Sequence, residues 1–480
     1  MGKLKRLAGE TVLYGFGSII PRFLNFLLVR LHTDVFGAEQ FGVMTKLFAY
    51  VAVINTIFMF GMETAYFRFA NKEGADERKV FNIAQTVVLA ISGVSSLLLL
   101  IFAQPIAAYL NIPARPDIVI WLVVLMFIDA AVALPFAQLR FYKKAFRFAV
   151  GKLMNVAILV FLNIFFLKLM DTPTRDVGYV VLANLIANAF YILFVAPSLL
   201  NWRPDYDREM TPAVFQYSFP ILITGLAGMT NEMFSRISLE KWLPAGFYGG
   251  KSNDYAVGIF GGAYKFAVLM NLGIQAFRYA AEPFFFASAT EKNSPQLFAR
   301  INHYFVIACC IVLLGVSINL DILKHFLKRP EFWEGLHLVP ILLVAYLFLG
   351  IYYNFSVWFK LSDKTYYGTI ITIIGAIITI AGNYWLIPIW GYDGSAWAAL
   401  ACYFSMTVLC YYYGQKYYPI PYNIAKLFGY IVITTFLCYA INYITIGNQW
   451  LATGFHLLVM AIYIGVIFLI ERKDLVPNRA

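Results

Sequence analysis

Two arginines interrupt the first long apolar segment of this chain. The segment runs from Thr11 to Phe36, with Arg22 near its middle and Arg30 toward its end. Placing a guanidinium in the hydrocarbon core of a membrane costs at least ~2.5–3.5 kcal/mol, so such a group usually faces a cavity, a partner or a substrate. We therefore interpret the segment as a membrane helix whose charges serve a function.

Charged residues recur in the later apolar segments. We expect the cations, together with Arg22 and Arg30, to bind an anionic substrate in a cavity, and the acids to serve in ion coupling or in ion pairs. The cations are Lys46, Arg236, Lys265 and Arg278, and the acids are Glu63, Asp129, Glu232 and Glu282. This pattern favours a transporter of an anionic substrate.

The composition identifies an all-α integral membrane protein. Only 13% of the 480 residues are charged and 61% are hydrophobic, whereas soluble domains average about 25% charged residues. Apolar runs of about 20 residues indicate helices rather than the short alternating strands of a membrane barrel. We place fourteen spans near residues 11–34, 40–69, 81–103, 117–139, 148–170, 177–199, 213–238, 255–285, 300–320, 336–358, 367–388, 394–414, 426–446 and 451–470.

The basic residues predict the orientation in the membrane. Lysine and arginine are concentrated in the connections that lie on the same side as the N-terminus, so we expect both termini in the cytoplasm. The net charge of +11 reflects this topology and attraction to lipid headgroups rather than nucleic-acid binding. Although Lys3, Lys5 and Arg6 precede the first apolar run, that run is too long and too polar for a cleaved signal sequence, and we expect a retained helix.

An internal duplication organises the chain. Lys46 and Glu63 are followed 219 residues later by Lys265 and Glu282. We therefore expect two six-helix lobes, with the substrate site at their interface, as in other transporters built from repeats. The predicted parts are an N-terminal lobe (1–205), a C-terminal lobe (206–415) and two further helices (416–480). Within the second lobe, Arg278 and Glu282 have the i,i+4 spacing of a helical ion pair.

The sequence motifs do not favour catalysis or nucleotide binding. The stretch AGFYGGKS at residues 245–252 loosely matches a phosphate-binding loop, but it lies between two predicted spans with no strand before it. The five histidines have no metal-ligand spacing, and the five cysteines are interpreted as packing residues. We expect no cofactor and no catalytic residue, and ion gradients or the membrane potential would drive transport.

Three stretches carry a family resemblance. PRFLNFLLVRLHTDVFGAEQFG, FGMETAYFRF and FRYAAEPFFF resemble the multidrug/oligosaccharidyl-lipid/polysaccharide exporter superfamily, and within it the polysaccharide exporters such as the O-antigen and teichuronic-acid flippases. The resemblance implies a two-lobed bundle of fourteen helices around a V-shaped cationic cavity. It also implies an alternating-access flippase of undecaprenyl-pyrophosphate-linked oligosaccharides in the bacterial cytoplasmic membrane, with membrane lipids, glycosyltransferases and a polysaccharide polymerase as partners; the oligomeric state stays open.

The resemblance also assigns roles to single residues. Arg22 stands fourteen residues before Phe36-Gly37, at the position of a cargo-binding arginine in the lipid II flippase branch. A second arginine of that branch, six residues later, is Leu28 here, which argues against lipid II as cargo. Polysaccharide exporters often have an acid directly before the arginine of the seventh helix. This chain has Ser235 there, with Glu232 one turn earlier, so acid-dependent coupling at this position is open.

The chemistry of the charges agrees with this resemblance. A pyrophosphate carries about two charges and cannot cross ~30 Å of hydrocarbon unaided, and arginine stays ionised and binds phosphate oxygens in pairs. Two other classes of membrane protein stay open: a cation-coupled multidrug exporter of the same superfamily and a membrane enzyme of lipid-linked glycan assembly.

Overall fold

Helices make up all the regular structure in the described part of the chain. The computed structural model describes residues 20–171, 175–289, 291, 293–444 and 446–475. Thirteen helical stretches there are long and apolar enough to cross a membrane. A further helix covers residues 20–35, and the start of that predicted span, residues 11–19, lies outside the described residues. The predicted all-α membrane fold with about fourteen spans is confirmed.

The predicted second span is bent rather than continuous. It consists of α2 (Ala38–Met59) and α3 (Met62–Ala70), which are separated by Phe60 and Gly61. Both linking residues have left-handed backbone conformations, with φ of 47° and 68°. Glycine adopts this conformation at little cost and commonly ends a helix, so the Phe60-Gly61 pair redirects the chain between the two helices.

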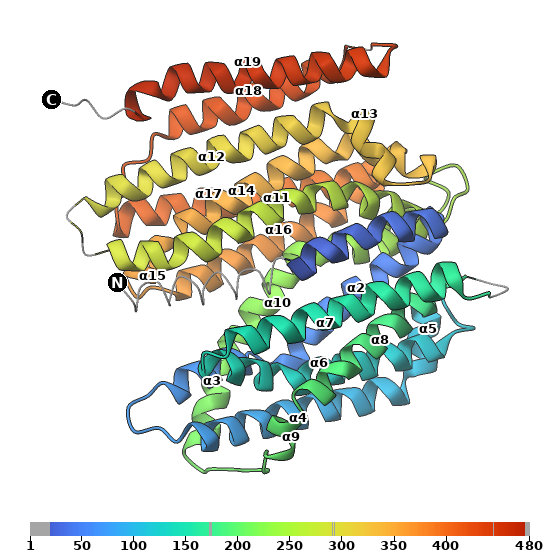
Figure 1. The fold of residues 1–480 in the computed structure, drawn as a ribbon, viewed down its shortest axis with the longest axis vertical. Coiled ribbons are helices and arrows are strands. Elements are labelled where there is room, and N and C mark those ends of the chain that lie inside the picture. The colour runs from blue at the N-terminus through green and yellow to red at the C-terminus, as the bar shows by residue number, and fades with distance from the viewer. Residues whose placement is uncertain (1–19, 172–174, 290, 292, 445, 476–480) are drawn as a thin grey trace. The chain divides into compact units, whose positions relative to one another are not determined.

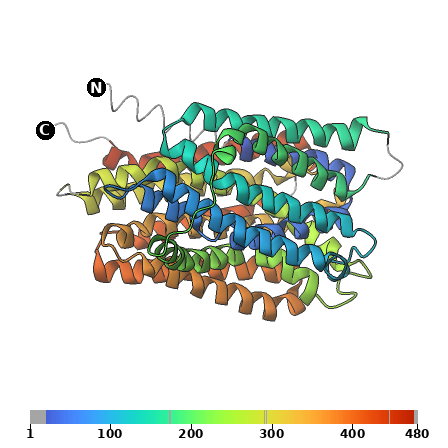
Figure 2. The same ribbon diagram turned by 90° about the horizontal axis from the view of Figure 1, so that it is seen from below.

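The helices belong to two compact units, and the first comprises residues 1–261 and 369–395. In this unit α6 packs against α4 and α8, α7 packs against α8, and α2 packs along α10. Figures 1 and 2 show α4, α6, α7 and α8 running along a common direction. The helices of the unit, besides the helix of residues 20–35, α2 and α3, are α4 (Glu77–Ile101), α5 (Ala103–Tyr109), α6 (Pro116–Phe141), α7 (Ala145–Ile164), η1 (Phe165–Leu169), α8 (Val177–Phe194), α9 (Ala196–Leu200), α10 (Met210–Trp242), the first turns of α11 (Asn253–Ser288) and most of α16 (Tyr366–Trp390).

Two glycines allow α2 and α11 to cross at very short range inside the first unit. A Cβ atom added to Gly42 would lie 1.8 Å from the carbonyl oxygen of Asp254, and one added to Gly258 would lie 1.8 Å from that of Ala38. The two backbones are therefore in direct contact. Membrane helices commonly use small residues for such close approach.

The second compact unit comprises residues 262–368 and 396–480. Its centre is α14, most of whose residues are buried, and α12 packs against α14 and α18. Glu471 of α19 binds Lys426 and Tyr430 of α18, so the last two helices are tied by polar contacts. The unit contains the rest of α11, α12 (Ser294–Ile318), α13 (Leu320–Leu323), η2 (Lys324–Phe326), η3 (Pro330–Leu338), α14 (Val339–Phe355), α15 (Val357–Leu361), most of α17 (Tyr392–Tyr417), α18 (Ile424–Asn442) and α19 (Gln449–Leu475).

The boundaries of the compact units differ from those of the predicted lobes. α10 opens the predicted C-terminal lobe, but it packs along α2 and belongs to the first unit. The division into lobes at 1–205, 206–415 and 416–480 describes a duplication in the sequence, and it stays a prediction. All five cysteines are free and buried, as expected for packing residues.

Adding a methyl group at the α2–α11 crossing should destabilise the protein. Gly42→Ala places a Cβ against the Asp254 carbonyl, and relieving such an overlap typically costs about 1–3 kcal/mol. Gly93→Ala in α4 is the matched control, since nothing lies within 4 Å of its added Cβ. Thermal unfolding of the detergent-solubilised protein should show a lower midpoint for Gly42→Ala only. An equal midpoint for both variants would contradict the close crossing.

Candidate functional site

Arg22, Glu232 and Arg236 form a charge cluster in the first unit. Arg22 lies on the helix of residues 20–35 with an exposed side chain, and it interacts electrostatically with Glu232 of α10. Arg236 is buried one turn after Glu232, where its Nη1 donates to the Glu232 carbonyl at 2.8 Å and lies 3.0 Å from Met233 Sδ. With two guanidinium groups and one carboxylate that interact electrostatically, the cluster has more basic than acidic groups.

Two other predicted substrate cations lie elsewhere. Arg30 is exposed, two helical turns beyond Arg22 on the same helix, and Lys265 is half-buried on the part of α11 that belongs to the second unit. Within the first unit, Arg22 and Arg236 thus both interact electrostatically with Glu232. Of the two cations in this cluster, Arg22 is exposed and Arg236 is buried.

Lys46 is held in a buried ion-pair network. Its side chain is fully buried, and its Nζ lies 3.1 Å from Glu240 Oε1 and 2.7 Å from Asp254 Oδ1. Glu240 Oε1 also accepts a hydrogen bond from Asn111 at 2.7 Å and lies 3.2 Å from Lys241 Nζ. Lys46 therefore ties α2 to the end of α10 and the start of α11, and it presents no open face to a ligand in this conformation.

Sequence reasoning did not identify the carboxylates that bind Lys46. The predicted spans near 213–238 and 255–285 leave Glu240 and Asp254 in the connection between them, but α10 continues to Trp242 and α11 begins at Asn253. The spacing of Glu232, Arg236 and Glu240 contained a usable signal. These residues recur every four positions on one helix face, which predicts a helix that extends past residue 238.

Glu63 and Glu282 occupy matching ion pairs in the two units. Glu63 of α3 binds Arg140 at the end of α6. Glu282 of α11 binds Lys360 of α15, and Arg278 Nε lies 3.4 Å from the same carboxylate, as the i,i+4 spacing predicted. Glu282 follows Glu63 by 219 residues and Lys360 follows Arg140 by 220, so the two pairs have nearly the offset of the predicted duplication.

Asp129 lies inside the first unit beside polar and aromatic groups. Its Oδ1 accepts a hydrogen bond from Asn188 Nδ2 at 2.7 Å, and Lys152 interacts with it electrostatically. The Lys152 ammonium lies 4.4 Å from the centre of the Phe136 ring and 4.6 Å from that of Tyr191. The arrangement is a half-buried acid–base pair supported by an amide and two aromatic rings.

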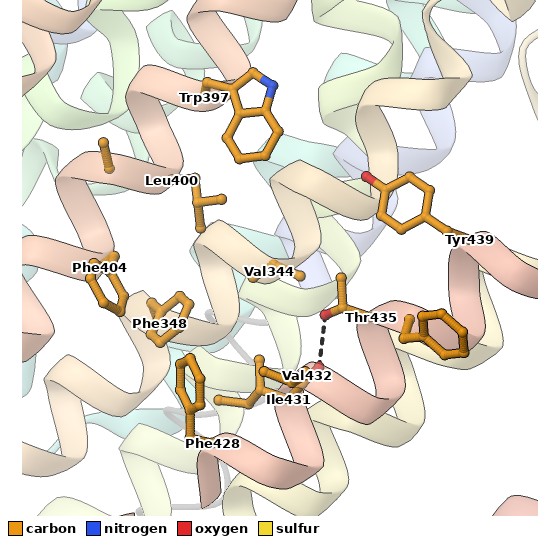
Figure 3. Close-up of a pocket in the computed structure, with 12 residues that line it drawn as sticks. Val344, Phe348, Trp397, Leu400, Phe404, Phe428, Ile431, Val432, Thr435 and Tyr439 are labelled. Atoms are coloured by element: carbon orange, nitrogen blue, oxygen red, sulfur yellow. Dashed lines mark hydrogen bonds between the residues drawn. The ribbon is translucent and has the colours of Figure 1, made fainter.

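A cavity in the second unit has a different chemistry. It has a volume of about 600 Å³ and lies between α14, α17 and α18. Figure 3 shows that Phe348, Phe404 and Phe428 point into it, and that the hydroxyl of Thr435 donates to the Ile431 carbonyl of its own helix, at 2.8 Å. With no charged lining residue, this cavity suits hydrocarbon rather than a pyrophosphate.

The buried ion pairs of Lys46 predict that stability depends on the balance of charge at this point. Lys46→Met removes the cation that Glu240 and Asp254 share and leaves Asp254 unpaired, with Lys241 as the remaining cation at Glu240. Breaking a buried ion pair in this way typically costs about 3–5 kcal/mol of unfolding free energy. The triple variant Lys46→Met/Glu240→Gln/Asp254→Asn should regain most of that loss, because no uncompensated charge remains. Denaturant unfolding in detergent measures both differences.

The control is the surface pair of Lys79 with Asp207, whose side chains are 41% and 26% exposed. Lys79→Met should change stability by no more than about 1 kcal/mol, since exposed pairs contribute little. Wild-type stability of Lys46→Met, or a triple variant as weak as the single one, would contradict the ion-pair account.

Solved structures of transporters share this fold over nearly the whole chain. A lipid II flippase, MurJ, in an inward closed conformation has a TM-score of 0.73 at 14% identity, covering 95% of this chain and 100% of that one. An inward-facing multidrug resistance MATE family transporter of the MOP superfamily has a TM-score of 0.66 at 14% identity, covering 87% and 99%. A mutant form of the Vibrio cholerae MATE transporter VcmN has a TM-score of 0.59 at 16% identity, covering 86% and 96%.

The sequence itself identifies the family. No curated protein sequence matches the chain. The family model described as "Polysaccharide biosynthesis protein" matches residues 7–289, which is more than half of the chain. Together with the fold, this match places the chain in the multidrug/oligosaccharidyl-lipid/polysaccharide superfamily, and the chain belongs to the polysaccharide biosynthesis protein family.

Proposed function

We propose that this protein is a flippase for an undecaprenyl-pyrophosphate-linked oligosaccharide. It moves this lipid from the cytoplasmic to the outer leaflet of the bacterial cytoplasmic membrane, for the biosynthesis of O-antigen lipopolysaccharide, capsule or exopolysaccharide. The observation that carries the proposal is the positive cluster of Arg22 and Arg236 around Glu232 in a chain of the polysaccharide biosynthesis family. The transporter fold favours translocation over catalysis.

The chemistry of the cargo fits this cluster. A pyrophosphate has about two negative charges, and ~30 Å of hydrocarbon is a prohibitive barrier to it. A guanidinium offers two parallel N–H donors to phosphate oxygens and keeps its charge when water is excluded. Arg22 is exposed while Arg236 is buried against its own helix, so Arg22 would contact the cargo and Arg236 would maintain the positive field.

The ion pairs support a duplicated, alternating-access architecture. Glu63 with Arg140 and Glu282 with Lys360 tie equivalent helices in the two halves of the sequence. We propose that the two halves form the lobes of residues 1–205 and 206–415. Lys46 then links the first lobe to α10 and α11 of the second lobe. This contact must break and re-form if the lobes move apart and together during transport.

The orientation in the membrane follows from the connections. Basic side chains gather where α3 joins α4, where α6 joins α7 and where α9 leads to α10, and these three connections lie on the side of the N-terminus if each span crosses once. The positive-inside rule then assigns this end to the cytoplasm. Both termini would be cytoplasmic, and the cargo would enter from that side.

A cation-coupled multidrug exporter is the second candidate. It is favoured by the fold similarity to multidrug transporters and by the half-buried acid Asp129 beside Lys152. Such an exporter would lower the sensitivity of its host to toxic organic cations. An unchanged sensitivity on overexpression, together with a defect in surface polysaccharide on deletion, separates the two functions.

Deleting the gene should trap the lipid-linked oligosaccharide on the cytoplasmic leaflet while its synthesis continues. Polyprenyl-linked sugars from the deletion strain should therefore accumulate and should resist a membrane-impermeant glycosidase applied to spheroplasts. Complementation with the intact gene should restore cleavage. Normal outer-leaflet exposure in a strain without a second exporter would contradict the proposed function.

Arg22→Ala should abolish transport at normal expression and membrane insertion, because the lost group serves the cargo more than the fold. Arg22→Lys keeps the charge without the planar fork, so it should retain partial activity. Arg30→Ala is the matched control on the same helix, and it should be less sensitive because Arg30 can extend its head toward water. The readout is surface polysaccharide in the complemented deletion strain, and normal export by Arg22→Ala would exclude Arg22 as the phosphate-binding residue.

A further inference from the structure

A polar cavity lies at one end of the first unit, and its lining residues do not include Arg22 or Arg236 of the predicted cargo site. It has a volume of about 380 Å³ and is formed by the start of α4, the end of α6, the start of α7 and α9. Arg78, Lys144 and Arg147 line it together with side-chain amides and hydroxyls. This lining sets it apart from the apolar cavity in the second unit.

Glu77, the one carboxylate in the lining of this cavity, already accepts three hydrogen bonds. Glu77 accepts hydrogen bonds from the hydroxyls of Tyr66 and Tyr142, both at 2.5 Å, and from Gln138 Nε2 at 3.2 Å. The hydrogen bond to Glu77 raises the pKa of the Tyr142 hydroxyl to about 12, so Tyr142 stays protonated and keeps donating. Glu77 therefore forms its hydrogen bonds with these three donors rather than with Arg78, Lys144 or Arg147.

The three cations are left with weak contacts. Arg147 Nη2 lies 3.4 Å from the Phe194 carbonyl, and the Lys144 ammonium is 5.6 Å from the centre of the Tyr142 ring. In the part of the chain that the structure describes, none of Arg78, Lys144 and Arg147 forms an ion pair with a carboxylate. With three cations and one carboxylate, the lining has a surplus of two positive charges.

Large apolar side chains flank the helices that form this cavity. Phe146, directly before Arg147, is 73% exposed, and Leu193 and Leu200, on α8 and α9, are 75% and 76% exposed. A soluble anion would gain nothing from these surfaces, whereas acyl chains would cover them. The combination of a cationic pocket with an apolar flank at the end of membrane helices is the chemistry of a phospholipid site.

We propose that this cavity binds the phosphate headgroup of an anionic phospholipid from the leaflet at that end of the helices. Arg78, Lys144 and Arg147 contact the phosphodiester, Ser198 and Asn201 hydrogen-bond the glycerol part, and the acyl chains lie along Phe146 and Leu193. The site is separate from the transport function proposed above, and it requires only that these helices span a membrane.

The test is titration of the purified full-length protein in detergent with phosphatidylglycerol, followed by native mass spectrometry. The variant Arg78→Gln/Lys144→Gln/Arg147→Gln should lower the affinity for phosphatidylglycerol by roughly 100-fold, since each basic residue near a lipid headgroup is worth roughly fivefold. Phosphatidylethanolamine, which has no net charge, should bind weakly to both proteins.

The control variant Lys72→Gln/Lys143→Gln/Arg208→Gln removes three exposed cations from the same end that do not line the cavity, and it should stay within about twofold of the wild type. Asn201→Asp adds a negative charge to the cavity without removing a cation, so it should also weaken phosphatidylglycerol binding. This variant provides the test if the triple variant does not fold. Equal losses in the cavity and control variants would overturn the proposal. Binding of inorganic phosphate as tight as that of phosphatidylglycerol would overturn it as well, because the site would then serve a soluble anion.

Discussion

The buried charge of Lys46 constrains the rest of the first unit. An ammonium group removed from water is tolerated only where carboxylates compensate it, and here Glu240 and Asp254 do so at 3.1 and 2.7 Å. The tight crossing at Gly42 and Gly258 brings α2 close enough to α11 for these contacts to form. Separating α2 from α10 and α11 would expose one cation and two anions, so any such movement requires water to enter at this point.

The charges within the helices therefore fall into two kinds. Glu63, Glu282 and Lys46 are bound to partners on neighbouring helices and hold those helices together. Arg22 is exposed, and it interacts electrostatically with Glu232, which also interacts with Arg236. Charge that is fully compensated stabilises a conformation, whereas surplus positive charge is available for an anionic ligand. This difference is why we propose Arg22, rather than Lys46, as the residue that contacts the cargo.

Much of the fold could be predicted from the sequence because the membrane imposes helices of a fixed length on apolar segments. The helical class, the approximate number of spans and the Arg278–Glu282 pair all depend on such local patterns. The bend at Phe60-Gly61 was not predicted, because hydropathy does not register a change of backbone conformation. The partners of Lys46 were missed because ion pairs between distant segments depend on where helices end, and hydropathy underestimates the length of helices with charged ends.

The candidate site was predictable only in part. An arginine within an apolar segment is a signal that singles out Arg22. Glu232 and Arg236, with which it forms the cluster, lie some 210 residues later in the chain, so their interaction with Arg22 depends on how the helices pack. The cationic cavity around Arg147 gave no sequence signal beyond the basic connections expected at the cytoplasmic side. Its assembly from four helix ends is visible only in three dimensions.

The central claim is that this protein moves a pyrophosphate-linked oligosaccharide across a bilayer, and reconstitution tests it most directly. The purified protein would be incorporated into liposomes that carry fluorescent undecaprenyl-pyrophosphate oligosaccharide in both leaflets, and a membrane-impermeant glycosidase would be added outside. The account predicts that nearly all of the lipid becomes cleavable with the protein present, against about half in protein-free vesicles, where only the outer leaflet is accessible. Cleavage that stops at the protein-free level, with the protein folded and inserted, would contradict it.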